Sequence, residues 1–243
     1  MERLSASTSV ATQTNTRLPL YAMAVGAAVA LVIGPSPGQA NGAPAAASIA
    51  DCADVEVVFA RGTFESPGVG NVGEPFIEAL GQRLPGRIIG VYAVNYPASL
   101  QFDRAVDGIV DASNHLRDLK ARCPTTEIVV GGYSQGAAVS GYVTSETVPT
   151  GYALTALPPD VADSIAAVVL FGNPSPGVLR LLQQDAPPIE IGPAFVARTI
   201  DLCAPGDPVC EPGGLDRAAH SAYAVNGMAG EAADFVVDHL RNR

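Results

Sequence analysis

The sequence predicts an α/β protein built from a five-stranded parallel β-sheet with helices on both faces. Short β-branched apolar runs alternate along the chain with longer segments whose apolar residues recur at helical spacing. One of these runs is uninterrupted, as expected for a strand buried on both faces. With 243 residues, 48% of them apolar, the chain can bury one sizeable core. We therefore expect a three-layer fold with right-handed crossovers, in one domain over residues 51–243.

The first 40 residues have the pattern of an export signal and are not expected to join the fold. Two arginines precede an apolar run at 18–33, which is shorter than the ~20 residues that a spanning helix needs. Small residues favour cleavage near Ala40, with Ala43-Pro44-Ala45 as a second candidate site. Residues 41–50 then form a flexible leader. The alternative is an uncleaved segment that anchors the domain at a membrane.

The first half of the domain is expected to contain two strands and two helices. Residues 55–60 (VEVVFA) and 87–94 are short apolar runs bounded by loop residues, which is typical of strands. A Gly-rich loop leads from the first strand to a helix at 74–84, and a longer helix follows at 102–122. The inward positions are Phe76, Ile77 and Leu80 in the first helix and Ala105, Ile109, Ala112, Leu116 and Leu119 in the second.

The second half is expected to contain three strands and two long helices. Residues 164–171 form the uninterrupted apolar run, and Gly172-Asn173-Pro174 ends it. The closing helix is expected at 223–243, with Ala224, Met228, Ala232, Phe235, Val236 and Leu240 inward. The other expected elements are a strand from 127, a helix ending near 147, a Pro-rich connection at 149–159 with a short helical turn, and a strand at 194–202.

The stretch Gly132-Tyr133-Ser134-Gln135-Gly136 fits the pattern G-x-S-x-G of a nucleophile elbow. In this motif the serine occupies a strained turn between a strand and a helix, and the glycines let the two backbones approach without a Cβ clash. With 25 glycines in the chain, a chance match arises on the order of one time in ten, so the motif alone is weak. The context strengthens it, because a strand-like run stops at the turn and no helix breaker follows until Gly141. We interpret Ser134 as a nucleophile at the carboxyl edge of the sheet.

A serine nucleophile needs a base, and three histidines are candidates. His115 precedes the serine and lies in a predicted amphipathic helix, so the chain order serine, acid, histidine of such hydrolases excludes it. His239 lies in the last helix turn, where a cation is ordinary helix-dipole chemistry. His220 remains, in a loop before the closing helix. The alternative is that His220 is a polar residue at a helix start without a chemical role.

The acid that orients the base must fall between Ser134 and His220 at a strand end. Asp207 meets this condition, on a turn that Pro205 and Pro208 restrict. Asp201 is the second candidate. As an alternative, the Asp207 carboxylate only stabilises its Pro-Gly turn.

An oxyanion hole needs backbone N–H groups that face the reacting carbonyl. The elbow supplies the N–H of Gln135, at the start of a helix. The loop after the first strand, Arg61-Gly62-Thr63, supplies the second, and Thr63 is the expected donor. The alternative is a threonine that only forms a turn.

Four cysteines agree with export, and their spacings match no C-x-x-C metal or redox pattern. Three pairings are possible. Cys203 and Cys210 flank a Pro-Gly turn that brings chain ends together, which leaves Cys52 to pair with Cys123.

The net charge of −10 excludes several classes of partner. Such a surface repels nucleic acid and anionic membranes, and the sequence has no cluster of lysines and arginines. We expect a monomer without a nucleic-acid partner and without stable membrane insertion once the signal is removed.

Four segments together resemble the cutinase family of small secreted serine esterases. They are Phe59-Ala60-Arg61-Gly62-Thr63-Phe64-Glu65, Gly131-Gly132-Tyr133-Ser134-Gln135-Gly136, the segment from Cys203 to Cys210, and His220-Ser221-Ala222-Tyr223. The resemblance runs from Cys52 to the closing helix. It implies an α/β-hydrolase core without a large lid domain, a Ser134, Asp207 and His220 triad, Thr63 and Gln135 as oxyanion donors, and both disulfides.

The resemblance also implies hydrolysis of carboxylic esters without a metal or cofactor. The chain is most similar to the bacterial cutinase-like branch, which acts on ester lipids and on short- and medium-chain model esters. Fungal members present apolar side chains between the last cysteine and the histidine, whereas this chain has Asp216 and Arg217 beside Leu215. This departure weakens the expectation of polymer binding. The alternatives are a phospholipase, thioesterase or carbohydrate deacetylase with the same triad, and a secreted binding or antigenic protein with a vestigial triad.

Overall fold

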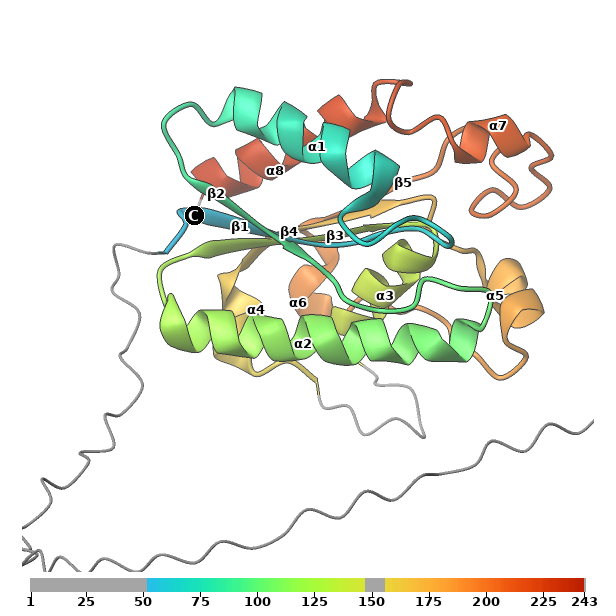
Figure 1. Ribbon diagram of the computed structural model, residues 1–243, viewed down its shortest axis with the longest axis horizontal. Coiled ribbons are helices and arrows are strands. Elements are labelled where there is room, and N and C mark those ends of the chain that lie inside the picture. The colour runs from blue at the N-terminus through green and yellow to red at the C-terminus, as the bar shows by residue number, and fades with distance from the viewer. Residues whose placement is uncertain (1–51, 147–155, 243) are drawn as a thin grey trace, which may run out of the picture. The chain divides into compact units, whose positions relative to one another are not determined.

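The computed structural model describes residues 52–146 and 156–242 (Figure 1). The expected signal, its cleavage near Ala40 and the leader at 41–50 lie outside the described residues. Most of the Pro-rich connection at 149–159 lies outside them too.

A single five-stranded sheet forms the middle layer of the described domain, with all strand pairs parallel. Its strand order is β2-β1-β3-β4-β5. The third and fourth strands lie inside the sheet, and all seven residues of the fourth are buried. The strands are β1 (Val55–Ala60), β2 (Ile89–Ala93), β3 (Glu127–Tyr133), β4 (Ile165–Phe171) and β5 (Thr199–Leu202). The expected parallel α/β class and five strands are confirmed.

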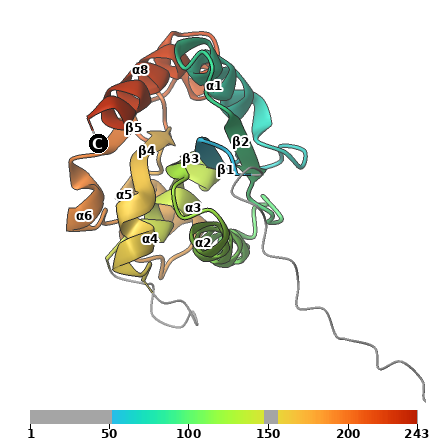
Figure 2. The ribbon, with the colours of Figure 1, turned by 90° about the vertical axis from the view of Figure 1, so that its left-hand side faces the viewer.

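Helices cover both faces of the sheet (Figures 1 and 2). Helices α1 (Gly70–Arg83) and α8 (Met228–Arg241) lie on one face, and α2 (Ala105–Arg122), α3 (Gln135–Val143) and α4 (Pro159–Ser164) lie on the other. Shorter segments complete the domain: η2 (Phe102–Arg104), α5 (Pro176–Leu182), α6 (Pro193–Val196) and α7 (Arg217–His220).

The core has two parts, one on each side of the sheet. In β1, Val57 and Phe59 pack toward α1 and α8. The alternating residues Val58 and Ala60 pack toward α2 and α3. This division follows from the two-residue period of a strand, which sends successive side chains to opposite faces. All five inward positions expected in α2 are buried.

Two expected helix starts were wrong. In each case a residue outside the periodic apolar pattern sets the start of the helix. Helix α1 begins at Gly70, before the expected Glu74, and the carboxylate of Glu65 accepts a hydrogen bond from Asn71 N in its first turn. Helix α8 begins at Met228 and not at residue 223. Gly227 is left-handed with φ 94°, and the preceding residues form a turn on the Ala222 carbonyl.

The expected strand at 194–202 is also partly wrong, because its first residues form helix α6 and β5 begins at Thr199. Pro193 opens that helix, and its fixed φ suits the first helical position. Helix α5 was not expected. Ser175 caps it by accepting a hydrogen bond from Val178 N, and Pro176 again opens the helix.

Among the described residues, none of the helices combines the length and the apolar character that a membrane span requires.

Candidate active site

Ser134 lies in a tight turn between β3 and α3, in the conformation expected of a nucleophile elbow. Its backbone has φ 55° and ψ −117°, a conformation that residues other than glycine rarely adopt. A Cβ on Gly136 would lie 2.0 Å from the Ala60 carbonyl oxygen, and a Cβ on Gly132 would lie 2.1 Å from the Gly136 carbonyl oxygen. Only glycine fits at either position. Ser134 N donates to the Phe171 carbonyl at 2.8 Å, which fixes the turn at the carboxyl edge of the sheet.

The structure brings Ser134, His220 and Asp207 into one hydrogen-bonded relay. His220 Nε2 lies 2.9 Å from Ser134 Oγ, and His220 Nδ1 lies 2.8 Å from Asp207 Oδ2. His220 ends the short helix α7, and Asp207 lies on the loop after β5. This arrangement can deprotonate the serine hydroxyl and stabilise the imidazolium that forms.

The other candidates for base and acid have different partners. Asp201 accepts a hydrogen bond from Asn173 Nδ2 at 3.0 Å, and burial raises the pKa of its carboxyl. His115 pairs with Glu56 and stacks on a tyrosine ring with a centroid distance of 3.5 Å. His239 bonds to carbonyl oxygens through both ring nitrogens.

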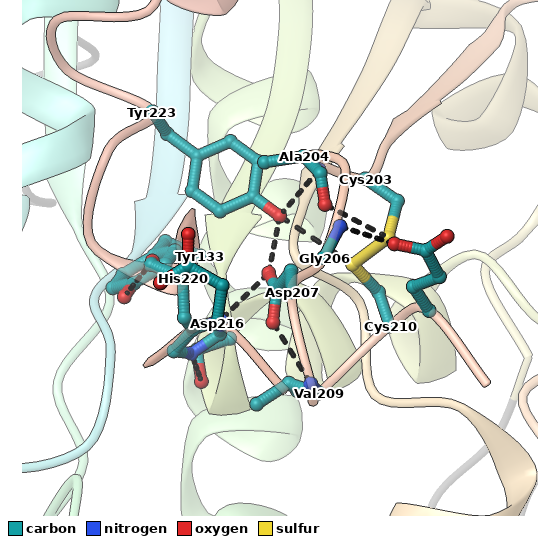
Figure 3. A network of polar contacts seen from close by, with 12 residues as sticks. Tyr133, Cys203, Ala204, Gly206, Asp207, Val209, Cys210, Asp216, His220 and Tyr223 are labelled. Atoms are coloured by element: carbon teal, nitrogen blue, oxygen red, sulfur yellow. Dashed lines mark hydrogen bonds and ion pairs between the residues drawn. A yellow bond between two sulfur atoms is a disulfide. The ribbon is translucent and has the colours of Figure 1, made fainter. Parts of the chain in front are cut away.

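The carboxylate of Asp207 is fully buried and accepts three hydrogen bonds (Figure 3). Its Oδ1 accepts from Val209 N at 2.8 Å, and its Oδ2 accepts from His220 and from the hydroxyl of Tyr223. Hydrogen bonds to the charged form compensate for the loss of water around a buried carboxylate. The Cys203–Cys210 disulfide closes the loop that carries Asp207, with a Cα–Cα distance of 5.8 Å.

Two tyrosines support the relay, and the sequence reasoning assigned a role to neither. Tyr223 is fully buried, and its hydroxyl accepts from Ala204 N at 3.1 Å while donating to Asp207. Tyr133 donates to the carbonyl oxygen of His220 at 2.6 Å (Figure 3). Burial raises the pKa of Tyr133 to about 12 and also raises the pKa of Tyr223, so both hydroxyls keep the proton they donate. The one sequence signal for these roles was that each tyrosine lies in one of the four segments that resemble the cutinase family, Tyr133 beside Ser134 and Tyr223 three residues after His220.

The two expected oxyanion donors lie at the same edge of the sheet as Ser134. Ala60 pairs with Gly132 in the β1–β3 register, so the loop after β1 starts beside the elbow. A Cβ on Gly62 would lie 2.7 Å from the Tyr133 ring, which shows how closely this loop packs on the elbow. Thr63 is partly buried there, and Gln135 is the first residue of α3.

Both expected disulfides are formed. Cys52 and Cys123 pair with a Cα–Cα distance of 5.7 Å, in addition to the bridge beside Asp207. Within 52–146 and 156–242, no cluster of three or more histidine, cysteine or acidic side chains has the arrangement of a metal site.

The cutinase family model matches residues 51–240. This chain belongs to the cutinase family. "Carboxylesterase Culp1" of Mycobacterium tuberculosis is 44% identical over 222 residues, which cover 91% of this chain and 94% of the relative. "Phospholipase Culp4" of the same organism is 46% identical over 191 residues, covering 79% of this chain and 80% of the relative.

Solved structures agree with the cutinase assignment. A Trichoderma reesei cutinase bound to a phosphonate inhibitor is 33% identical, with a TM-score of 0.60, covering 78% of this chain and 77% of that one. An acetyl xylan esterase is 25% identical, with a TM-score of 0.65, covering 78% of this chain and 99% of that one. The α/β-hydrolase fold of a cutinase and the expected enzyme class, a carboxylic ester hydrolase, are confirmed.

Proposed function

We propose that this member of the cutinase family is a secreted serine carboxylesterase that hydrolyses short- to medium-chain, lipid-like carboxylic esters. The observation that carries the proposal is the unbroken relay from Ser134 Oγ through His220 to Asp207, with both distances below 3 Å. Each group has the environment its role requires. The serine is raised on a strained turn, the imidazole bridges both partners, and the acid is buried and fully bonded.

In the first half of the reaction, His220 Nε2 takes the proton from Ser134 Oγ as the oxygen attacks the ester carbonyl carbon. The carbonyl oxygen becomes an oxyanion, which the N–H groups of Thr63 and Gln135 stabilise. Asp207 holds the Nδ1 proton of the imidazolium and keeps the ring oriented. His220 then protonates the departing alkoxide, and an acyl-enzyme remains.

In the second half, water takes the place of the alcohol. His220 removes a proton from the water, the hydroxide attacks the acyl carbon, and the carboxylic acid leaves as Ser134 regains its proton. The same two N–H donors stabilise the second oxyanion, so one pre-formed site serves both steps.

Exposed apolar side chains in and near the loop after β1 that follows Arg61 (residues 62–65, the oxyanion loop) support a lipid-like substrate. Phe64 is 73% exposed and Leu100 is 67% exposed, and Phe64 N donates to the carbonyl of Ala98 in the loop that carries Leu100. An acyl chain that lies along these side chains buries apolar surface on both partners. The two disulfides and the apolar segment at 18–33 support secretion, with a signal at 1–40, a leader at 41–50 and the catalytic domain at 51–243.

The test starts with Ser134→Ala, with Ser113→Ala on helix α2 as the matched control. We expect Ser134→Ala to lose at least about 1,000-fold in hydrolysis of p-nitrophenyl butyrate while remaining folded by circular dichroism, and the control to keep wild-type activity. A fluorophosphonate should label the wild type and the control but not Ser134→Ala. A folded Ser134→Ala that keeps most of the activity would reject the nucleophile. A wild type that is neither labelled nor active would favour the binding or antigenic protein.

A second candidate function is phospholipid hydrolysis, which the similarity to "Phospholipase Culp4" favours. The same relay serves either substrate, so a substrate panel separates them. We expect the highest kcat/KM for p-nitrophenyl esters with acyl chains of about 4 to 8 carbons, and lower rates with phosphatidylcholine vesicles and acetylated xylan. A preference for phosphatidylcholine would make the protein a phospholipase, and a preference for acetylated xylan a carbohydrate deacetylase.

A further inference from the structure

Arg61 directly precedes the oxyanion loop and is buried, with 5% of its surface exposed. Within the part of the chain that the structure describes, its guanidinium donates only to backbone carbonyl oxygens: Nε to Glu65 at 2.9 Å, Nη2 to Tyr96 at 2.6 Å and Nη1 to Val94 at 3.4 Å. No carboxylate of the described chain lies within ion-pair distance of it. A buried cation without a counter-ion costs several kcal/mol, so simple packing does not account for it.

Tyr96 completes a reciprocal link with Arg61. Its hydroxyl donates to the Arg61 carbonyl oxygen, while the Arg61 guanidinium lies 5.1 Å from the centre of the Tyr96 ring. Tyr96 is itself 5% exposed. The two residues therefore tie the loop after β1 to the segment after β2 through three kinds of contact, all shielded from water.

The same two segments meet again on the other side of Thr63. Phe64 N donates to the Ala98 carbonyl at 2.7 Å, and the next carbonyl, that of Ser99, accepts from the Gln135 side chain at 2.8 Å. The loop after β2 thus bridges the oxyanion loop and the first residue of α3, which carry the two expected donors.

Backbone strain marks the same assembly. Phe64, Ala98 and Ser134 have φ of 64°, 48° and 55°, and within the described residues they are the non-glycine residues with positive φ. Such conformations cost about 1–3 kcal/mol each and persist only where the surroundings enforce them. All three lie in segments that these hydrogen bonds join to one another.

The Thr63 N–H is left available by this arrangement. Glu65 accepts from Gly62 N at 2.6 Å, so the preceding N–H is already used. In the residues that the structure covers, the Thr63 N–H has no protein acceptor. A backbone donor held without a partner beside the nucleophile is the feature that an oxyanion hole requires.

We propose that Arg61 and Tyr96 are positioning residues that hold Gly62-Thr63 in the geometry that the oxyanion hole requires. This inference rests on the proposed esterase function. The planar guanidinium fork reaches the Glu65 carbonyl oxygen in the loop after β1 and, at the same time, the Val94 and Tyr96 carbonyl oxygens in the segment after β2. The single ammonium of lysine cannot hold both segments in this way. The geometry of the fork, and not the charge alone, is what the loop needs.

The experiment compares Arg61→Lys and Tyr96→Phe with the control Arg83→Lys. Arg83 also forms a fork, to Asp234 at 2.6 and 3.0 Å, but between α1 and α8. With p-nitrophenyl butyrate we expect Arg61→Lys to lower kcat roughly 10- to 100-fold, with KM within about twofold of wild type. Tyr96→Phe should lower kcat by about 3- to 10-fold, because it removes one hydrogen bond and keeps the ring. Arg83→Lys should leave kcat unchanged.

Inhibition by butylboronic acid separates positioning from a general loss of structure. Its tetrahedral adduct with the serine places an oxygen in the oxyanion hole, so its affinity should fall by the same factor as kcat/KM in both variants. Wild-type kcat in Arg61→Lys would overturn the proposal. So would a loss of kcat no larger than the fraction of the variant that is unfolded under the assay conditions, as calculated from its urea unfolding curve. If Arg61→Lys does not fold, Tyr96→Phe decides, and wild-type kcat there rejects the role. Failure of the esterase proposal is distinct, since the wild type itself would then be inactive.

Discussion

At the scale of single residues, the buried carboxylate of Asp207 shows how the relay is held in place. Its three donors come from Val209 two positions along, from His220 thirteen positions along and from Tyr223 sixteen positions along. Gly172 contributes by being small, since a Cβ there would lie 3.1 Å from His220 Cε1 and 3.2 Å from Asp207 Oδ2. Each oxygen of this buried carboxylate therefore has at least one hydrogen-bond donor.

Tyr223→Phe tests the Tyr223 donor. We expect kcat/KM to fall roughly 3- to 10-fold, because Asp207 loses a hydrogen bond that fixes its orientation toward His220. The free energy of unfolding should fall by about 1–2 kcal/mol, since the Ala204 N–H also loses its acceptor.

Tyr92→Phe is the matched control for that substitution. The Tyr92 hydroxyl also donates to a carboxylate, that of Asp111 at 3.0 Å, but between edge strand β2 and helix α2. It should lose a comparable amount of stability with unchanged kcat/KM, as measured by urea unfolding and p-nitrophenyl butyrate hydrolysis. If both variants kept full activity, Tyr223 would have a structural role only.

At the scale of elements, the unit of β3, the elbow and α3 depends on backbone contacts that exclude side chains. The start of α3 approaches the end of β1 so closely that a methyl group on Gly136 would overlap the Ala60 carbonyl. This close approach brings the helix N-terminus, with its positive dipole end, to the site beside Ser134. The close approach of α3 to β1 at Gly136 therefore accounts both for the packing of the elbow and for the positive helix end beside Ser134.

Gly136→Ala and Gly81→Ala should change stability in opposite directions. A Cβ on Gly136 would lie 2.0 Å from backbone, so we expect a loss of about 3 kcal/mol or more, or failure to fold. A Cβ on Gly81, inside helix α1, would meet its nearest atom at 3.9 Å, so alanine should add roughly 0.5–1 kcal/mol. Urea unfolding measures both. Equal effects at the two sites would show that the elbow can relax, contrary to this account.

At the scale of the whole molecule, the two disulfides do different work. The Cys52–Cys123 bridge closes a loop of 71 residues and joins the chain before β1 to the end of α2. The Cys203–Cys210 bridge spans 7 residues and encloses Asp207. Chain-entropy arguments assign about 4 kcal/mol to the long loop and about 2.5 kcal/mol to the short one.

Replacing each cysteine pair by serines should therefore separate stability from activity. Cys52→Ser with Cys123→Ser should lower the free energy of unfolding by about 4 kcal/mol, with kcat near wild type at temperatures where the variant is folded. Cys203→Ser with Cys210→Ser should cost about 2.5 kcal/mol and lower kcat as well, because the Asp207 loop is released. Unfolding curves and kcat on the same samples decide, and an unchanged kcat in the second pair would argue against a role of that bridge in holding Asp207.

Much of the candidate site could be predicted because its chemistry leaves local marks. Ser134 lies in a five-residue motif, and His220 and Asp207 follow from chain order and from the few residues able to fill each role. The strands were predicted because burial on both faces demands apolar runs. The helix starts at Gly70 and Met228 were missed, since a side chain or a left-handed glycine outside the periodic pattern sets each one.

The sequence by itself determined the fold class and predicted Ser134, His220 and Asp207 as a triad, because hydrophobic periodicity and motif spacing are properties of neighbouring residues. Only the tertiary structure decided which donors surround Asp207, and that the buried Arg61 joins the loop after β1 to the loop after β2. Tyr133 and His220 are 87 residues apart, and no local pattern encodes their hydrogen bond. Such contacts exist only once the parallel sheet has brought the carboxyl ends of its strands to one edge, since that is where the separate loops meet.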